Sequence, residues 1–183
     1  MQQLSLIAPT LAWGDEIVAY RQKTLARDGH INGGGRLDQY ERVSDWLAWL
    51  EQMSSAATCG AGLVPSTTLL CVDRAARRVV GTVDIRHVLN DYLRRFGGHI
   101  GYAIRPAERG KGYGTVQLRL ALDYAASRLG LARVLITCDR TNEASRRTIL
   151  SCGGVLENEV WDEQDGKFTQ RYWVEAARPP ERA

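Results

Sequence analysis

The stretch GHIGYAIRPAERGKGYG, residues Gly98–Gly114, decides the fold to be expected of the whole chain. Its apolar part, Ile100–Ile104, predicts a short strand, and Pro106 forces a turn directly after it. A glycine-rich loop follows and runs into a long sequence with helical periodicity. This order of strand, loop and helix is the unit around which the other elements are predicted to be arranged.

The glycine loop itself has the features of an anion site. Gly110, Gly112 and Gly114 permit backbone bends and close approach by a ligand. Arg109 and Lys111 add positive charge at the same place. Bare amides at a helix N-terminus favour a phosphate or pyrophosphate group. We therefore expect the functional site at this loop.

Periodicity and breakers predict the remaining elements, and their order is β-α-α-β-β-β-α-β-α-β-β. This is a mixed α/β fold with a mostly antiparallel sheet flanked by helices. The expected strands are 3–7, 67–73, 79–87, 100–104, 134–137, 155–161 and 169–174. The expected helices are 11–26, 36–53, a helix after the glycine loop that ends at Gly130, and 142–151. Residues 28–35, DGHINGGG, are either a surface connection or a substrate-side lid, and 90–98 is a polar loop.

Composition bounds the function class. The 183 residues suit one domain, and the net charge of +3 is dispersed, which does not favour a nucleic-acid partner. The sequence shows no signal peptide and no membrane span, so we expect a cytoplasmic protein without a membrane partner. The four cysteines have no metal-ligand or disulfide spacing, so we expect reduced thiols and no metal: Cys59, Cys71, Cys138 and Cys152.

Two phosphate-binding motifs fit the glycine loop poorly. A Walker-type loop needs Ser or Thr after its lysine, whereas Gly112 follows Lys111. A dinucleotide fold would place a ribose-binding acid near Asp139, but its glycine fingerprint is broken, because Thr115 stands where the third glycine belongs. The residues 105–109 also separate the strand from the first glycine. The dinucleotide enzyme remains the weaker alternative.

Arg109-Gly110-Lys111-Gly112-Tyr113-Gly114 matches the pattern Arg/Gln-x-x-Gly-x-Gly/Ala, between a strand with Pro106 and a long helix. In this the chain resembles the GNAT superfamily of acyl-CoA-dependent N-acyltransferases, and the element order matches over nearly the whole chain. The resemblance implies one GNAT-like domain over residues 1–175, followed by a C-terminal tail over 176–183. Arg86-His87-x-x-Asn90 and Gly98-His99-Ile100-Gly101-Tyr102 are similar to a group of bacterial predicted acetyltransferases, which brings no substrate with it.

The resemblance implies direct acetyl transfer from acetyl-CoA to a primary amine, which could be a small molecule or a peptide. Family members often dimerise, so a homodimer is compatible with it. A non-catalytic acyl-CoA sensor is the alternative from another class. The implied donor-binding residues are the strand backbone and the glycine loop, with an Asn-x-x-Ser motif on the next helix: Tyr102, Ala103, Ile104, Arg109, Gly110, Lys111, Gly112, Tyr113, Gly114, Thr115, Asn142 and Ser145.

The catalytic acid and base are less clearly marked. Many family members carry a tyrosine seven residues after the Asn, as an acid for the departing thiolate, but Ile149 stands there. A thiol has a pKa of roughly 8.5, so its thiolate leaves without much help. The candidate bases are His99, His87 and Asp84. Strand alternation sends the side chains of Asp84 and His87 to opposite faces, so both cannot serve one site without a bulge.

Overall fold

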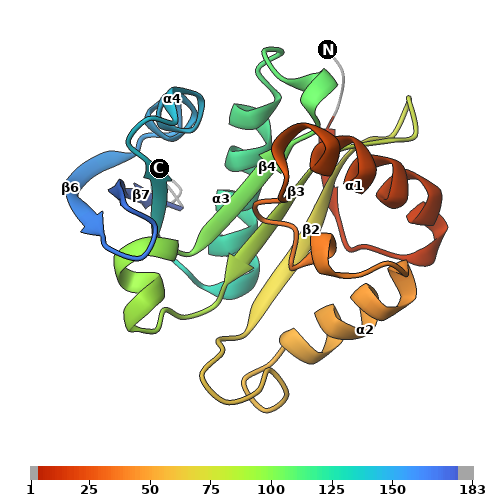
Figure 1. Cartoon of the computed structure of the whole chain (residues 1–183), viewed down its shortest axis with the longest axis horizontal. Coiled ribbons are helices and arrows are strands. Elements are labelled where there is room, and N and C mark those ends of the chain that lie inside the picture. The colour runs from red at the N-terminus through yellow and green to blue at the C-terminus, as the bar shows by residue number, and fades with distance from the viewer. Residues whose placement is uncertain (1–3, 177–183) are drawn as a thin grey trace, which may run out of the picture.

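Two antiparallel sheets form the framework of the molecule, whose computed structural model describes residues 4–176 (Figure 1). The first sheet has the order β1-β2-β3-β4 and the second the order β5-β7-β6. The strands are β1 Leu4–Ile7, β2 Ser66–Asp73, β3 Arg78–Arg86, β4 Ile100–Ile104, β5 Arg133–Asp139, β6 Val155–Asp162 and β7 Lys167–Glu175. The predicted mixed α/β class, with mostly antiparallel strands in one domain, is confirmed.

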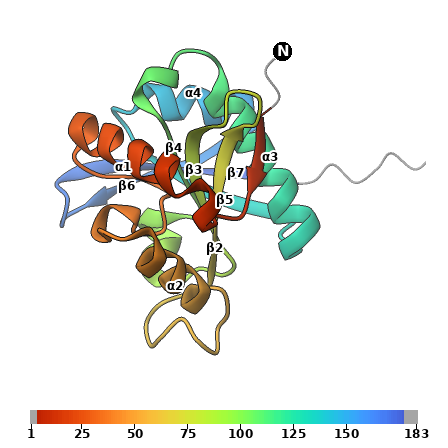
Figure 2. The ribbon, with the colours of Figure 1, turned by 90° about the vertical axis from the view of Figure 1, so that its right-hand side faces the viewer.

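Helices cover both faces of the first sheet. The helices are α1 Gly14–Asp28, α2 Val43–Met53, α3 Tyr113–Leu129 and α4 Glu143–Ser151. Leu70 packs with α1 and α2, whereas its neighbour Leu69 packs with α3, because successive side chains of a strand point to opposite faces. Figure 2 accordingly shows α1 and α2 on one side of β2 and β3, with α3 on the other side.

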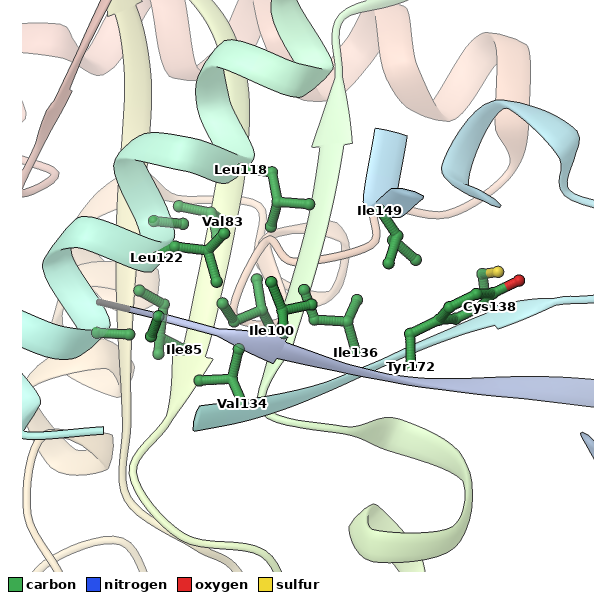
Figure 3. Packing of buried hydrophobic residues seen from close by; sticks show 14 of the residues in the cluster. Val83, Ile85, Ile100, Leu118, Leu122, Val134, Ile136, Cys138, Ile149 and Tyr172 are labelled. Atoms are coloured by element: carbon green, nitrogen blue, oxygen red, sulfur yellow. The ribbon is translucent and has the colours of Figure 1, made fainter. Parts of the chain in front are cut away.

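The main core lies where the two sheets meet α3 and α4. Val83 and Ile85 of β3, Leu118 and Leu122 of α3 and Ile136 of β5 point toward one another there (Figure 3). One face of α3 is buried, and Gly130 ends this helix, as predicted, in a left-handed conformation with φ 67°. The burial of this face explains why α3 is held firmly behind the glycine loop.

Two segments differ from the expectation. The helix predicted over 36–53 begins only at Val43, because a short 3-10 turn, Leu37–Gln39, and extended residues precede it. The guanidinium of Arg21 on α1 donates to the carbonyl oxygens of Tyr40 and Glu41, which a continuous helix would use for itself. The loop predicted over 90–98 contains a π-helical turn, Leu93–Gly97, whose first amide donates to Asn90 Oδ1 at 2.9 Å.

Gln3 of the predicted first strand and residues 177–183 of the predicted tail lie outside the described residues. Within residues 4–176, none of the helices combines the length and the apolar character that a membrane span requires. The same part of the chain contains no group of His, Cys, Asp and Glu side chains that could hold a metal ion.

Strands β4 and β5 belong to different sheets but touch at one end. The amide of His99 donates to the carbonyl oxygen of Leu135 at 2.6 Å, and the amide of Leu135 donates to His99 Nδ1 at 2.9 Å. Gly98 permits this approach, because a Cβ there would lie 2.6 Å from the Leu135 carbonyl oxygen. Beyond this junction the two strands diverge, and the edge of β4 is left open.

Candidate active site

A cavity of about 1190 Å³ occupies the space between the diverging strands. Its walls are β4, the glycine loop with the start of α3, the end of β5, α4 and the segment 28–33. All of the sequence-predicted donor-binding residues line it except Lys111. The structure therefore brings together residues that are distant in the chain, from Tyr102 to Ser145, around one space.

The open edge of β4 supplies backbone hydrogen-bonding groups to this cavity. The amide of Arg86 donates to His99 O at 2.8 Å and that of Arg105 to Val80 O at 2.7 Å. In an antiparallel pair, hydrogen-bonded residues alternate with residues that do not bond across the pair. These bonds and the continuous register of β3 and β4 therefore show that the N–H and C=O groups of Ala103 bond with β3. The peptide groups of Tyr102 and Ile104 consequently face the cavity. A β-bulge is not needed to expose these peptide groups, because β5 belongs to the other sheet and does not pair with β4 there.

The glycine loop is shaped for close approach by a ligand. Gly110 and Gly112 have φ values of 78° and 79°, which residues with a side chain rarely adopt. A Cβ at either position would have no atom within 4 Å, so the space beside both glycines is open. The first helical turn of α3 follows at once, and amides in such a turn have no partner within the helix. The amides of Gly114 and Thr115 in this turn therefore suit an anion.

Lys111 does not line the cavity. Its Nζ binds Glu108 Oε2 at 2.7 Å, and Arg78 binds the other oxygen of the same carboxylate at 2.8 Å. These two cations hold the pKa of Glu108 below its ordinary value. Lys111 thus forms an ion pair with Glu108 on the same loop. Its assignment to donor binding stays a prediction.

Arg109 connects the loop to the other side of the cavity. Its Nε donates to Ile104 O at 3.0 Å, and its Nη1 donates to Asp28 Oδ1 at 3.0 Å, with a second bond from Nη2 to Asp28 Oδ2. This bidentate pair holds the pKa of Asp28 below its ordinary value. The last residue of α1 is thereby tied to the loop that precedes α3.

Asn142 and Ser145 lie where the Asn-x-x-Ser motif predicts them, at the start of α4. Asn142 is the N-cap, and its Oδ1 accepts the amide of Ser145 at 3.0 Å. The hydroxyl of Ser145 bonds the hydroxyl of Tyr102 at 3.0 Å. Burial raises the pKa of Tyr102 to about 12, so its phenol stays protonated at neutral pH. The two hydroxyls join α4 to β4 across the cavity wall.

Two nearby residues take no part in this wall as reactive groups. Ile149 is completely buried in the main core, so the position of the family tyrosine does not face the cavity in this chain. Cys138 lines the cavity, but burial raises the pKa of its thiol to about 11, and the thiol donates to Gln170 Oε1 at 3.9 Å. It is therefore present as a thiol that packs against the core.

The three predicted bases lie outside the cavity lining. His99 is buried at the β4–β5 junction, where its Nδ1 accepts the Leu135 amide and burial lowers its pKa to about 4. His87 Nε2 bonds Thr67 Oγ1 at 2.9 Å, and burial lowers its pKa as well. The buried carboxylate of Asp84 accepts a hydrogen bond from Thr68 Oγ1 at 2.8 Å. Their catalytic roles remain predictions, and each side chain already has a structural partner.

The segment 28–35 forms a fixed wall. A Cβ on Gly33 would lie 2.1 Å from Gly101 O and 2.5 Å from Tyr102 N, so the two backbones are in direct contact. Trp46 Nε1 donates to the carbonyl oxygens of Gly34 and Gly35 at 3.1 and 3.0 Å. These contacts pack the segment against β4 and α2, and its predicted role as a substrate-side lid stays a prediction.

This wall adds cavity-lining residues that were not singled out in the sequence, and His30 is one of them. It lines the cavity between Asp28, which is held near Ile104 by Arg109, and Gly33, which lies against Gly101. Its Nδ1 lies 3.0 Å from Asp28 O and its Nε2 lies 3.0 Å from Asn32 Nδ2. With the Asn32 amide donating to Nε2, the proton is on Nδ1. Its position within a glycine-rich loop was the only signal in the sequence.

The protein-family model described as Acetyltransferase (GNAT) domain matches residues 15–155 of the chain. A comparison with curated proteins finds no match. Among solved structures, the ribosomal-protein-S5-alanine acetyltransferase from Vibrio fischeri is similar, with a TM-score of 0.73, 16% identity and coverage of 98% of this chain and 97% of that chain.

Two further solved structures share the fold. The microcin C7 self-immunity acetyltransferase MccE, in complex with acetyl-CoA and AMP, has a TM-score of 0.67, 19% identity and coverage of 96% and 93%. A mutant of the spermidine N-acetyltransferase SpeG from Vibrio cholerae has a TM-score of 0.67, 18% identity and coverage of 96% and 95%. At these identities the likeness concerns the fold, and the named acceptors differ from one another.

Proposed function

Because the chain belongs to the GNAT acetyltransferase family, whose acyl donor is acetyl-CoA, we propose that it transfers the acetyl group directly to a primary amine bound beside β4. The observation that carries this proposal is the single cavity, which joins the glycine loop to the wall formed by residues 28–33. Donor and acceptor can therefore meet along the open edge of one strand. The acceptor itself does not follow from the relatives, whose printed substrates differ.

The donor half fits acetyl-CoA by its shape and its hydrogen-bonding groups. The outward peptide groups of Tyr102 and the amide of Ile104, whose carbonyl oxygen already accepts Arg109 Nε, could bind a pantetheine chain in the manner of an added strand. The amides of Gly114 and Thr115, above the open space at Gly110 and Gly112, could hold the pyrophosphate. Acetyl-CoA supplies an activated acyl carbon, and the backbone amides of β4 would stabilise negative charge on its carbonyl oxygen.

The acceptor amine must lose a proton before or during the attack. We assign this proton to Nε2 of His30, because His30 lines the cavity and the three other candidates do not. The amide of Asn32, which now donates to Nε2, would give way to the amine, and the bond from Nδ1–H to Asp28 O would orient the ring. A histidine is suited to this task near neutral pH.

The departing thiolate would accept a hydrogen bond from the hydroxyl of Tyr102 or Ser145. Both residues lie in the cavity wall and take the place of the absent tyrosine on α4. Since a thiol has a pKa of roughly 8.5, a hydrogen bond suffices and a strong acid is unnecessary. This arrangement supports direct transfer, in which the amine nitrogen bonds the acyl carbon as the carbon–sulfur bond breaks and the amine's proton passes to His30.

The proposal is tested by calorimetry with acetyl-CoA together with a thiol-release assay over a panel of primary amines. We expect acetyl-CoA binding and amine-dependent release of CoA. Binding without release on any amine would support the non-catalytic sensor instead. Binding of NAD in place of acetyl-CoA would support the dinucleotide alternative and overturn both acyl-CoA assignments.

A further inference from the structure

We propose that Arg86 binds an acidic group of the acceptor, so that the amine acetylated by this protein also carries a carboxylate or a phosphate. The inference rests on the proposed function and specifies the substrate class of the same site. It is carried by the position of this side chain, by the way it is held and by the charges around it.

Arg86 lies at the acceptor end of the cavity. It is the last residue of β3 and lines the cavity, and its Nη1 lies 3.9 Å from the place of a Cβ on Gly101. Gly101 precedes Tyr102, whose outward peptide group would face the thioester. The glycine loop with its anion site adjoins the opposite end of β4, after Ile104. Arg86 is therefore separated from the pyrophosphate site by the length of the strand.

The guanidinium is held in place through Nη1 and Nε. Its Nη1 donates to the carbonyl oxygens of Gly97 and Gly98 at 3.0 and 3.1 Å. Its Nε lies 3.8 Å from Asp84 Oδ2, and Asp84 is fixed in turn by Thr68. Among the described residues, Nη2 has no hydrogen-bond partner, and a quarter (25%) of the side-chain surface is exposed. A fixed guanidinium with a remaining donor is well prepared for a carboxylate or phosphate.

The carboxylates that line the cavity are already engaged. Within the described part of the chain, Asp28 is paired with Arg109, and Glu108 is paired with Arg78 and Lys111. Asp139 accepts the amide and the hydroxyl of Thr141, both at 2.7 Å. A polyamine would therefore find no carboxylate that is without a partner. Asp84 partly offsets the charge of Arg86, but it is buried and does not line the cavity.

The experiment measures binding to the CoA-saturated protein, so that it does not depend on turnover. Calorimetric titrations at low ionic strength compare β-alanine with β-alaninamide, phosphoethanolamine with ethanolamine, and a peptide that has an acidic second residue with its amide counterpart. Spermidine is added as a polycation. We expect at least one acidic amine to bind about tenfold or more tightly than its neutral partner, which is the usual effect of one charge-assisted hydrogen bond. The arms distinguish carboxylate from phosphate and a small acid from a peptide.

Variants show whether Arg86 is responsible. In Arg86→Gln the preference for the acidic partner should disappear while the Kd of CoA stays within about twofold, and Arg86→Lys should keep part of the preference. Arg42→Gln is the control, because Arg42 is an exposed arginine on the edge of α2. Equal binding of acidic and neutral partners by the wild type, preferred binding of spermidine, or no acidic amine bound below roughly 10 mM would overturn the proposal. Acid-selective binding without acetyl transfer would instead uphold it and contradict the proposed function.

Discussion

The carboxylate of Asp28 at the end of α1 forms a bidentate ion pair with the guanidinium of Arg109 in the glycine loop. Arg109 also donates to Ile104 O, so one side chain contacts β4 and the end of α1 at once. Both residues line the cavity, so the pair links two of its walls.

Asp28→Asn should lower the free energy of unfolding at pH 7 by less than about 1 kcal/mol, because both partners are partly exposed to solvent. Arg109 lowers the pKa of Asp28, so the stabilisation is present above the ordinary aspartate pKa and is lost as the pH falls through the folded value. The difference between wild type and variant in urea unfolding should therefore shrink as the pH is lowered from about 5 to 3. Asp45→Asn removes a more exposed pair as a control. A difference that is independent of pH would contradict this account.

Gly112→Glu should abolish acetyl-CoA binding while the protein remains folded, because it adds bulk and negative charge where the pyrophosphate is expected. The matched control is Gly130→Glu at the other end of α3, where φ is 67° and a Cβ would again meet no atom within 4 Å. Both variants incur a similar backbone strain of about 1–2 kcal/mol. Calorimetry and thermal unfolding separate the two effects. Unchanged affinity in Gly112→Glu would refute the loop assignment.

His30→Gln should lower kcat by about a hundredfold or more, with the Kd of acetyl-CoA unchanged, if the ring accepts the proton of the amine. His87→Gln and His99→Asn test the residues predicted as bases from sequence. A loss of kcat in either of these, with His30→Gln active, would return the role of base to the sequence prediction.

His99 should make the protein less stable in mildly acidic solution. Its pKa is about 4 in the folded protein, and an unfolded histidine titrates near 6.5. The unfolded state therefore binds more protons between these values, so stability is complete above pH 6.5 and falls toward pH 4, by at most about 3 kcal/mol. His99→Asn keeps an acceptor for the Leu135 amide but does not titrate, so its urea-unfolding midpoint should depend less on pH. An equal pH dependence in wild type and variant would contradict this assignment.

The local structure around the expected donor site could be predicted from the sequence because its signals are local. The strand Ile100–Ile104 has its predicted bounds, and Asn142 caps the helix that its motif predicts. Gly112 and Gly130 begin and end α3 with the left-handed conformations that glycine allows. Each of these features is decided by residues within a few positions of one another.

The proposed acceptor half could not be predicted because it is built by contacts between distant segments. The place of His30 depends on the packing of Gly33 against Gly101, and the orientation of Arg86 depends on carbonyl groups of a π-helical turn that was predicted as a loop. The late start of α2 has a similar cause, because Arg21 of α1 takes the carbonyl groups of Tyr40 and Glu41. No pattern within one element records such contacts.

The backbone contact between Gly33 and Gly101 also limits how the protein can be altered. A side chain at position 33 would collide with Gly101 O and Tyr102 N, which are backbone atoms that cannot rotate away. Positions 30 and 32, in contrast, line the cavity and are exposed. Variant libraries intended to change acceptor choice should therefore randomise positions 30 and 32 and keep Gly33 and Gly101. Every variant would then retain the spacing between the segment 28–35 and β4.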